Sequence, residues 1–224
     1  MHIPDGFING PTSVAFGAVA AVGAAIAIRS ARRSLDTRVA PLAGLTAVFV
    51  FAAQMINFPV AAGTSGHLIG GALAAVLVGP SAGALAITVV LVVQALMFAD
   101  GGLSALGLNV TNLALLSVVA SWAVFGLVRS VLPNHRTSVV AAAAVAAFVS
   151  VPVASLGFVA QYALGGTGDV AIGTVLWSVV GVHLLIGIGE AVITGFVVSS
   201  VMASRSDLVV GWKVTTPERK AVAA

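Results

Sequence analysis

The sequence contains no cysteine, and only 8% of its 224 residues are charged. Without thiols the chain can form neither disulfide bonds nor thiolate metal sites, and it has no cysteine nucleophile. Because about a quarter of the residues in a soluble domain are charged, the low charge and the 59% of hydrophobic residues exclude an ordinary soluble core. We therefore expect an integral membrane protein that is all α-helical.

Sequence motifs of nucleotide hydrolases and of zinc proteases are also missing. The sequence has no Gly-x-x-x-x-Gly-Lys-Ser/Thr loop to cradle phosphates and no His-Glu-x-x-His pair for a catalytic zinc. We therefore expect a protein that is not an enzyme and has no catalytic cofactor. A sequence pI of about 10.2 could suggest nucleic acid as a partner, but a net charge of only +3 spread over many apolar segments is better explained by membrane topology.

Seven apolar runs are candidate membrane spans. They comprise residues 14–28, 39–58, 68–78, 82–99, 103–128 and 138–162, and a stretch within 172–203. The third run is too short to cross alone, because eleven helical residues rise about 16 Å against a hydrocarbon core of about 30 Å. We expect one transmembrane bundle over residues 1–203 with an N-terminal metal-binding leader, 1–10, and a cytoplasmic tail, 204–224.

The basic residues predict how the bundle is oriented. All ten fall between the first and second runs, between the fifth and sixth, or after the seventh: Arg29, Arg32, Arg33, Arg38, Arg129, Arg136, Arg205, Lys213, Arg219 and Lys220. With seven spans these segments share one side, which the positive-inside rule makes cytoplasmic. The N-terminus is then outside and the C-terminus inside. The opposite side carries Asp5, Asp100 and Asp169 but no basic residue, which would attract cations.

The N-terminal leader has a histidine at its second position. The Met1 amine, the His2 amide and the His2 imidazole Nδ1 could fill three corners of a square through two adjacent chelate rings. Square-planar nitrogen coordination suits Ni²⁺ or Cu²⁺ better than Zn²⁺, Ca²⁺ or Mg²⁺. Since removal of the initiator methionine normally requires a small second residue, we expect Met1 to remain. The leader lacks the basic start of a signal peptide; on His2 alone, a disordered terminus is the other interpretation.

His67 is the other histidine on the outward side, at the start of the short third run. A helix N-terminus disfavours imidazolium, so the ring would stay neutral and able to bind a metal. The other interpretation is a hydrogen-bonded core histidine. Ten leader residues reach at most about 35 Å, enough to fold back to His67. Ser65, Asn57 and Asn109 are candidate hydrogen-bond partners around the ligands.

His183 and Glu190 lie seven residues apart on the last run, hence on roughly one helical face. An ionised carboxylate at mid-membrane costs about 3 kcal/mol, so Glu190 should be protonated, paired or facing a polar cavity. Both residues are candidate transit groups, and hydrogen bonding between helices is the equally open alternative. We assign Asp100 to the turn between the fourth and fifth runs.

Four segments resemble one known family. They are MHIPDGF (1–7), GTSGHLIGG (63–71), QALMFADGG (94–102) and GIGEAVIT (187–194). These resemble the CbiM/NikM substrate-binding membrane subunits of cobalt and nickel energy-coupling-factor (ECF) transporters, which serve cobalamin biosynthesis among other pathways. The resemblance implies a metal held by the Met1 amine, the His2 amide and imidazole, and His67. It also implies a bacterial or archaeal cell membrane, a transmembrane coupling subunit, two ABC ATPases and often a small accessory membrane subunit.

The function predicted from these observations is capture of Ni²⁺ or Co²⁺ as the transported substrate of an ABC-type importer. Two alternatives stay open: a stand-alone proton-coupled metal carrier with Glu190 and His183 as its relay, and a non-transporting membrane metal sensor. Both metals fit the donor set, because the intrinsic affinity of such a site for Ni²⁺ is only mildly higher than for Co²⁺.

Overall fold

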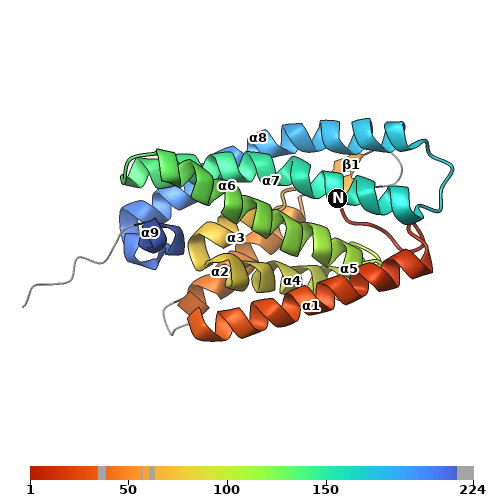
Figure 1. Cartoon of the computed structure of the whole chain (residues 1–224), viewed down its shortest axis with the longest axis horizontal. Coiled ribbons are helices and arrows are strands. Elements are labelled where there is room, and N and C mark those ends of the chain that lie inside the picture. Colours follow the sequence, from red (N-terminus) through yellow and green to blue (C-terminus); the bar gives the residue numbers. More distant parts are fainter. Residues whose placement is uncertain (35–38, 57, 61–63, 216–224) are drawn as a thin grey trace, which may run out of the picture.

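The computed structural model describes residues 1–34, 39–56, 58–60 and 64–215. They form a bundle of helices with one short antiparallel hairpin (Figure 1). The elements are α1 (Gly10–Ser34), α2 (Val39–Gln54), β1 (Phe58–Val60), β2 (Thr64–Gly66), α3 (Gly71–Val78), α4 (Pro80–Met97), α5 (Leu106–Asn109), η2 (Val110–Leu116, a π-helix), α6 (Ser117–Val131), α7 (Arg136–Gly165), α8 (Ile172–Arg205), η3 (Ser206–Leu208) and α9 (Val210–Thr215).

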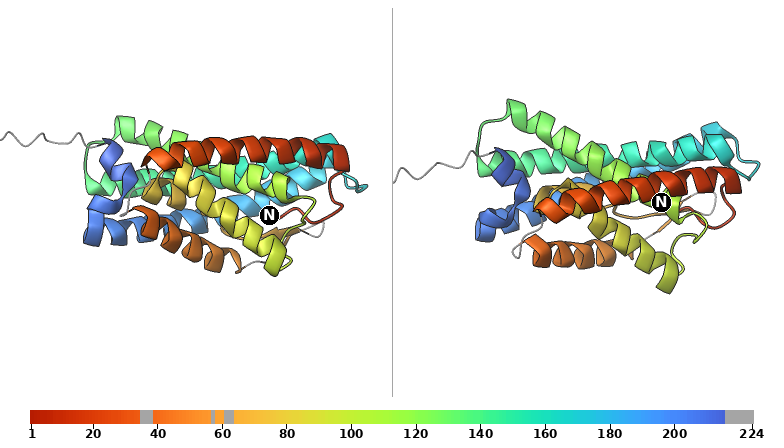
Figure 2. Two further views of the ribbon diagram at one scale, coloured as in Figure 1. Left: turned by 90° about the horizontal axis from the view of Figure 1, so that it is seen from below. Right: turned by 60° about the horizontal axis from the view of Figure 1, so that its bottom comes forward.

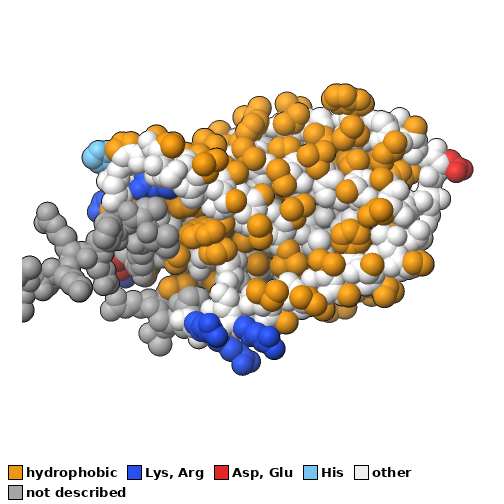
Figure 3. All heavy atoms as spheres, in the orientation of Figure 1, with side chains coloured by type: hydrophobic (Ala, Val, Ile, Leu, Met, Phe, Trp, Pro, Cys, Tyr) orange, Lys and Arg blue, Asp and Glu red, His pale blue; other side chains and the backbone are white. Residues whose placement is uncertain are grey.

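Each predicted apolar run coincides with a helical segment. Five segments of the described chain are long and apolar enough to cross a membrane: Gly10–Arg33, Pro80–Met97, Leu106–Val131, Arg136–Gly165 and Ile172–Leu208. α2 is apolar but shorter, at 16 residues. Large hydrophobic side chains such as Val14, Trp177 and Phe196 are exposed. Hydrophobic side chains cover much of the face shown in Figure 3, as expected of a surface in contact with lipid. The chain is therefore a multi-pass membrane protein whose candidate spans are all helices, and the short β1–β2 hairpin is its one departure from the predicted all-α fold in the described residues.

The short third helix lies at the centre of the bundle. All eight residues of α3 are buried, and it packs against α2, α4, α6, α7, α8 and α9. It begins at Gly71, three residues later than the predicted start of the run. The reason is Gly70, whose φ of +83° departs from helical geometry and whose missing Cβ leaves room for Val50. Residues 67–70 are thus irregular backbone inside the bundle.

Basic side chains gather at one end of the molecule. Arg32 and Arg33 are in the last turn of α1, Arg129 is in the last turn of α6, and Arg205 ends α8. On the face shown in Figure 3, Lys and Arg appear only at this end, on the left. The leader and the α7–α8 turn lie at the opposite end (Figures 1 and 2).

Candidate metal centre

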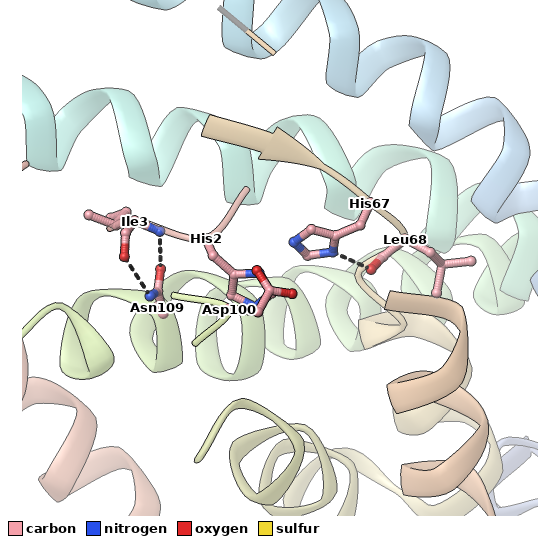
Figure 4. A network of polar contacts seen from close by, with 6 residues as sticks. All are labelled: His2, Ile3, His67, Leu68, Asp100 and Asn109. Carbon is pink, nitrogen blue, oxygen red and sulfur yellow. Dashed lines mark hydrogen bonds and ion pairs between the residues drawn. The ribbon is translucent and has the colours of Figure 1, made fainter. Parts of the chain in front are cut away.

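The leader enters the bundle and is anchored by Asn109, the last residue of α5. The Ile3 amide donates to Asn109 Oδ1 at 2.7 Å, and Asn109 Nδ2 donates to the Ile3 carbonyl at 3.2 Å (Figure 4). The Gly102 amide donates to the same carbonyl at 2.9 Å. Ile3 is fully buried. These bonds fix the backbone immediately after His2. The π-helix η2 follows Asn109 directly, and π-helices are frequent at functional sites.

Two outer turns hold the rest of the leader. Asp5 Oδ1 accepts hydrogen bonds from the Ser104 amide at 2.7 Å and the Ser104 hydroxyl at 2.6 Å. The Thr167 hydroxyl donates to the Gly6 carbonyl at 2.6 Å. At Gly102 a Cβ would lie only 2.3 Å from the Asp5 amide nitrogen, so a residue with a side chain would displace the leader. The leader is therefore an ordered part of the fold.

The anchored leader places His2 beside His67. Both rings are buried, and they stack with their centroids 4.4 Å apart and an interplanar angle of 21°. His67 Nδ1 lies 2.8 Å from the Leu68 carbonyl oxygen. Because a carbonyl only accepts, Nδ1 must carry the proton, and Nε2 keeps its lone pair. His67 Nε2 has no hydrogen-bond partner among the described residues, so this nitrogen could bind a metal.

The Met1 amine is buried at the same place. Burial lowers the pKa of this amine to about 4, although the negative charge of Asp100 acts in the opposite direction. At neutral pH the amine is then uncharged and has a lone pair to donate. Burial likewise lowers the pKa of the His2 imidazole. The site therefore brings together neutral nitrogen donors rather than cations.

Asp100 lies next to His2. Its Oδ1 is 3.1 Å from His2 Nδ1, and it is the only carboxylate within ion-pair distance of His2 in the described chain. Burial of Asp100 opposes its ionisation, but the hydrogen bond and charge interaction with His2, together with the charge interaction with the N-terminal amine, hold the pKa of the carboxyl below its ordinary value. A metal bound through His2 Nδ1 would replace this contact, and the Asp100 carboxylate would then offset part of the metal's charge.

His183 and Glu190, both on α8, have different partners. Buried His183 donates from Nδ1 to the Val179 carbonyl at 2.7 Å, as an α-helical back-bond, and its Nε2 has no partner among the described residues. It is close enough to interact electrostatically with the Met1 amine and with His67. Glu190 instead accepts hydrogen bonds from the amides of Ile69 and Gly70, each at 2.8 Å.

The family of this chain can now be decided by comparison. A family described as the CbiM cobalt uptake substrate-specific transmembrane region matches residues 2–208. The chain belongs to the CbiM family. The resemblance predicted from the four sequence segments is thereby confirmed.

Relatives of this CbiM-family chain are transport proteins. It is 38% identical to a putative metal transport protein of Haloquadratum walsbyi, with 93% of each chain covered. It is 39% identical to a putative fused nickel transport protein NikMN of Archaeoglobus fulgidus, over 93% of this chain and 68% of that longer one. A crystal structure of a truncated transition metal transporter matches with a TM-score of 0.83 and 29% identity, covering 91% of this chain and 99% of that one.

The candidate metal centre of this CbiM-family chain differs from most protein metal sites in the kind of donor atoms it offers. Its described residues contain no group of three or more His, Cys, Asp or Glu side chains that could hold a metal ion. The candidate centre instead combines two imidazoles with two main-chain nitrogens, the Met1 amine and the His2 amide, so side chains alone do not define it. Asp100 was missed as a site residue, although it stands in one of the four segments. Ser65 lies in β2, two residues before His67, and Asn57 lies outside the described residues.

Proposed function

We propose that this chain is the substrate-capture subunit of an ECF-type ABC importer for Ni²⁺ or Co²⁺. One observation carries the proposal: the first two residues are buried against His67, with the His2 and His67 rings stacked 4.4 Å apart. The metal, as transported substrate, would be bound by the Met1 amine, the His2 amide and imidazole, and His67 Nε2. Cobalt and nickel transport by relatives supports these two ions as the cargo.

The chemistry of the donors supports capture of a borderline metal ion. Four nitrogens suit Ni²⁺ and Co²⁺ better than hard cations, which prefer oxygen ligands. The His2 amide must lose its proton to bind, so capture releases protons and should weaken as the pH falls. The hydrogen bond from His67 Nδ1 to Leu68 keeps the other ring nitrogen free for the metal.

We further propose that the N-terminus faces outward and the C-terminus the cytoplasm, in a bacterial or archaeal cell membrane. Seven spans would form the bundle of residues 1–203, with residues 204–224 as a cytoplasmic tail. The gathering of Arg32, Arg33, Arg129 and Arg205 at the end opposite the leader supports this orientation.

Reporter fusions test the orientation. Fusions after Arg33, Arg136 and Lys213 are expected to report cytoplasmic locations, because these positions follow the basic residues at one end of the bundle. A fusion within residues 165–169 should report an external location. Paired alkaline phosphatase and fluorescent protein reporters at each site measure this. An external signal after Arg136 would contradict the seven-span arrangement.

Energy for transport would come from partners. With no phosphate-binding loop in its sequence, the chain would work with a transmembrane coupling subunit, two ABC ATPases and, in some systems, a small accessory membrane subunit.

The purified chain is therefore expected to bind about one Ni²⁺ or Co²⁺ per molecule by calorimetry, yet to show no ATPase activity. Metal uptake in cells should require the partner genes. The comparison is uptake by cells that express this chain alone or with its partners. Strong uptake by the chain alone, abolished by a proton uncoupler, would overturn the importer and support the proton-coupled carrier.

A further inference from the structure

The segment that carries His67 is clamped through two consecutive peptide groups. In the first, the Leu68 carbonyl accepts the proton of His67 Nδ1 at 2.8 Å, and the Ile69 amide donates to Glu190 Oε2 at 2.8 Å. In the second, the Ile69 carbonyl accepts from Gln54 Nε2 at 2.8 Å, and the Gly70 amide donates to Glu190 Oε1 at 2.8 Å. Both oxygens of one carboxylate thus hold both peptide groups.

Among the described residues, the hydrogen-bond partners of Glu190 are the amides of Ile69 and Gly70. It is 1% exposed, and within the described part of the chain no basic side chain forms an ion pair with it. The amides it binds lie at the N-terminal end of α3, where main-chain N–H groups and the helix dipole stabilise a negative charge. Its partners in the structure are therefore main-chain groups of the His67 segment.

A planar peptide group connects Glu190 directly to His67. The N–H that Glu190 accepts and the C=O that His67 donates to belong to the same Leu68–Ile69 peptide, whose atoms move as one rigid unit. A carboxylate on the N–H also polarises the peptide, which strengthens the bond its carbonyl accepts. That bond in turn fixes the orientation of the imidazole and raises the basicity of Nε2.

We propose that Glu190 is the positioning residue of His67, acting through the Leu68–Ile69 peptide without touching the metal. This inference rests on the proposed function, in which His67 Nε2 binds the transported ion. In many metal sites a carboxylate accepts a hydrogen bond directly from the metal-binding histidine. Here one peptide group stands between the Glu190 carboxylate and His67. Gln54 holds the adjoining peptide from α2, so the ring depends on two helices at once.

A double-mutant cycle with Ni²⁺ tests the proposal. Glu190→Gln keeps the volume but places an amide N–H against a backbone N–H, and it is expected to weaken nickel binding about 10 to 100-fold, as loss of a ligand-orienting partner does. In a His67→Ala background the same substitution should change affinity by less than about 3-fold, because coupled residues are not additive. Calorimetry and the nickel absorption bands are measured for all four proteins.

Thr194→Val is the matched control, since Thr194 is equally buried one helical turn further along α8. It should leave the nickel affinity unchanged. If Glu190→Gln fails to give a cooperative thermal unfolding transition, the cycle is repeated with Glu190→Asp, which keeps the charge but is too short to reach both amides.

The outcomes separate this inference from the proposed function. An equal loss of affinity in both backgrounds, or no loss in either, would overturn the positioning role while leaving the metal site intact. If His67→Ala alone binds nickel as tightly as the unmodified chain, the proposed site itself is wrong. Loss of uptake with unchanged affinity and spectrum would instead make Glu190 a transit group.

Discussion

Adding a single residue before Met1 is expected to abolish stoichiometric high-affinity nickel binding. The extension moves the terminal amine out of reach of the five-membered chelate ring. A histidine at the third position can still chelate a metal through two amides, but this uses four nitrogens of the leader and leaves no corner for His67. The structure adds a steric reason, because Met1 is 2% exposed and Ile3 is fully buried, so an added residue has no space.

Calorimetry with Ni²⁺ on four proteins measures this effect. They are the chain with a native N-terminus, the chain with one added glycine, a control with the same extension after Ala224, and the His2→Ala variant. The control should bind like the native chain, and His2→Ala should fail like the extended one. The loss should exceed 100-fold, or about 2.7 kcal/mol at 1.36 kcal/mol per factor of ten. Tight binding by the extended chain would refute the terminal-amine site and point to His67 with His183.

Replacing His67 by alanine is expected to weaken nickel binding by more than 100-fold. The substitution removes the one proposed ligand that comes from outside the leader, whereas loss of an outer hydrogen-bond partner weakens metal sites only about 10 to 100-fold. His67 Nε2 faces the cluster with no partner among the described residues, while its other nitrogen is held by Leu68. The affinity for Ni²⁺ and for Co²⁺ is measured by calorimetry on the purified variant.

His183→Ala is the matched control for this experiment. His183 is as buried as His67 and also donates from Nδ1 to a main-chain carbonyl, so both substitutions remove a similar side chain from a similar environment. We expect the His183 variant to lose less than about 10-fold, the lower limit for a partner around a metal. A larger loss of affinity from His183→Ala than from His67→Ala would mean that His183 binds the metal and that His67 does not.

Much of the fold follows from the sequence because membrane spans are local. A run of apolar residues predicts a membrane helix, and its flanking arginines predict the side on which it ends, however the helices pack against one another. The helices therefore lie where the apolar runs predicted them, and the five long ones are candidate spans in the structure. The start of α3 was predicted too early because hydrophobicity does not report backbone conformation, and the positive φ of Gly70 ends the irregular segment there.

The candidate ligands could also be named from the sequence, because the chelate rings of Met1 and His2 depend only on adjacent atoms. The surroundings of the ligands could not. Asp100 meets His2 only because the leader folds back, and Glu190 holds the peptide beside His67 from 121 residues away. Such contacts depend on how the helices pack, and no local pattern encodes which buried carboxylate faces which main-chain amide. The sequence determined where the apolar helices lie and named the candidate donor atoms, whereas only the packing of the helices decided what surrounds those atoms.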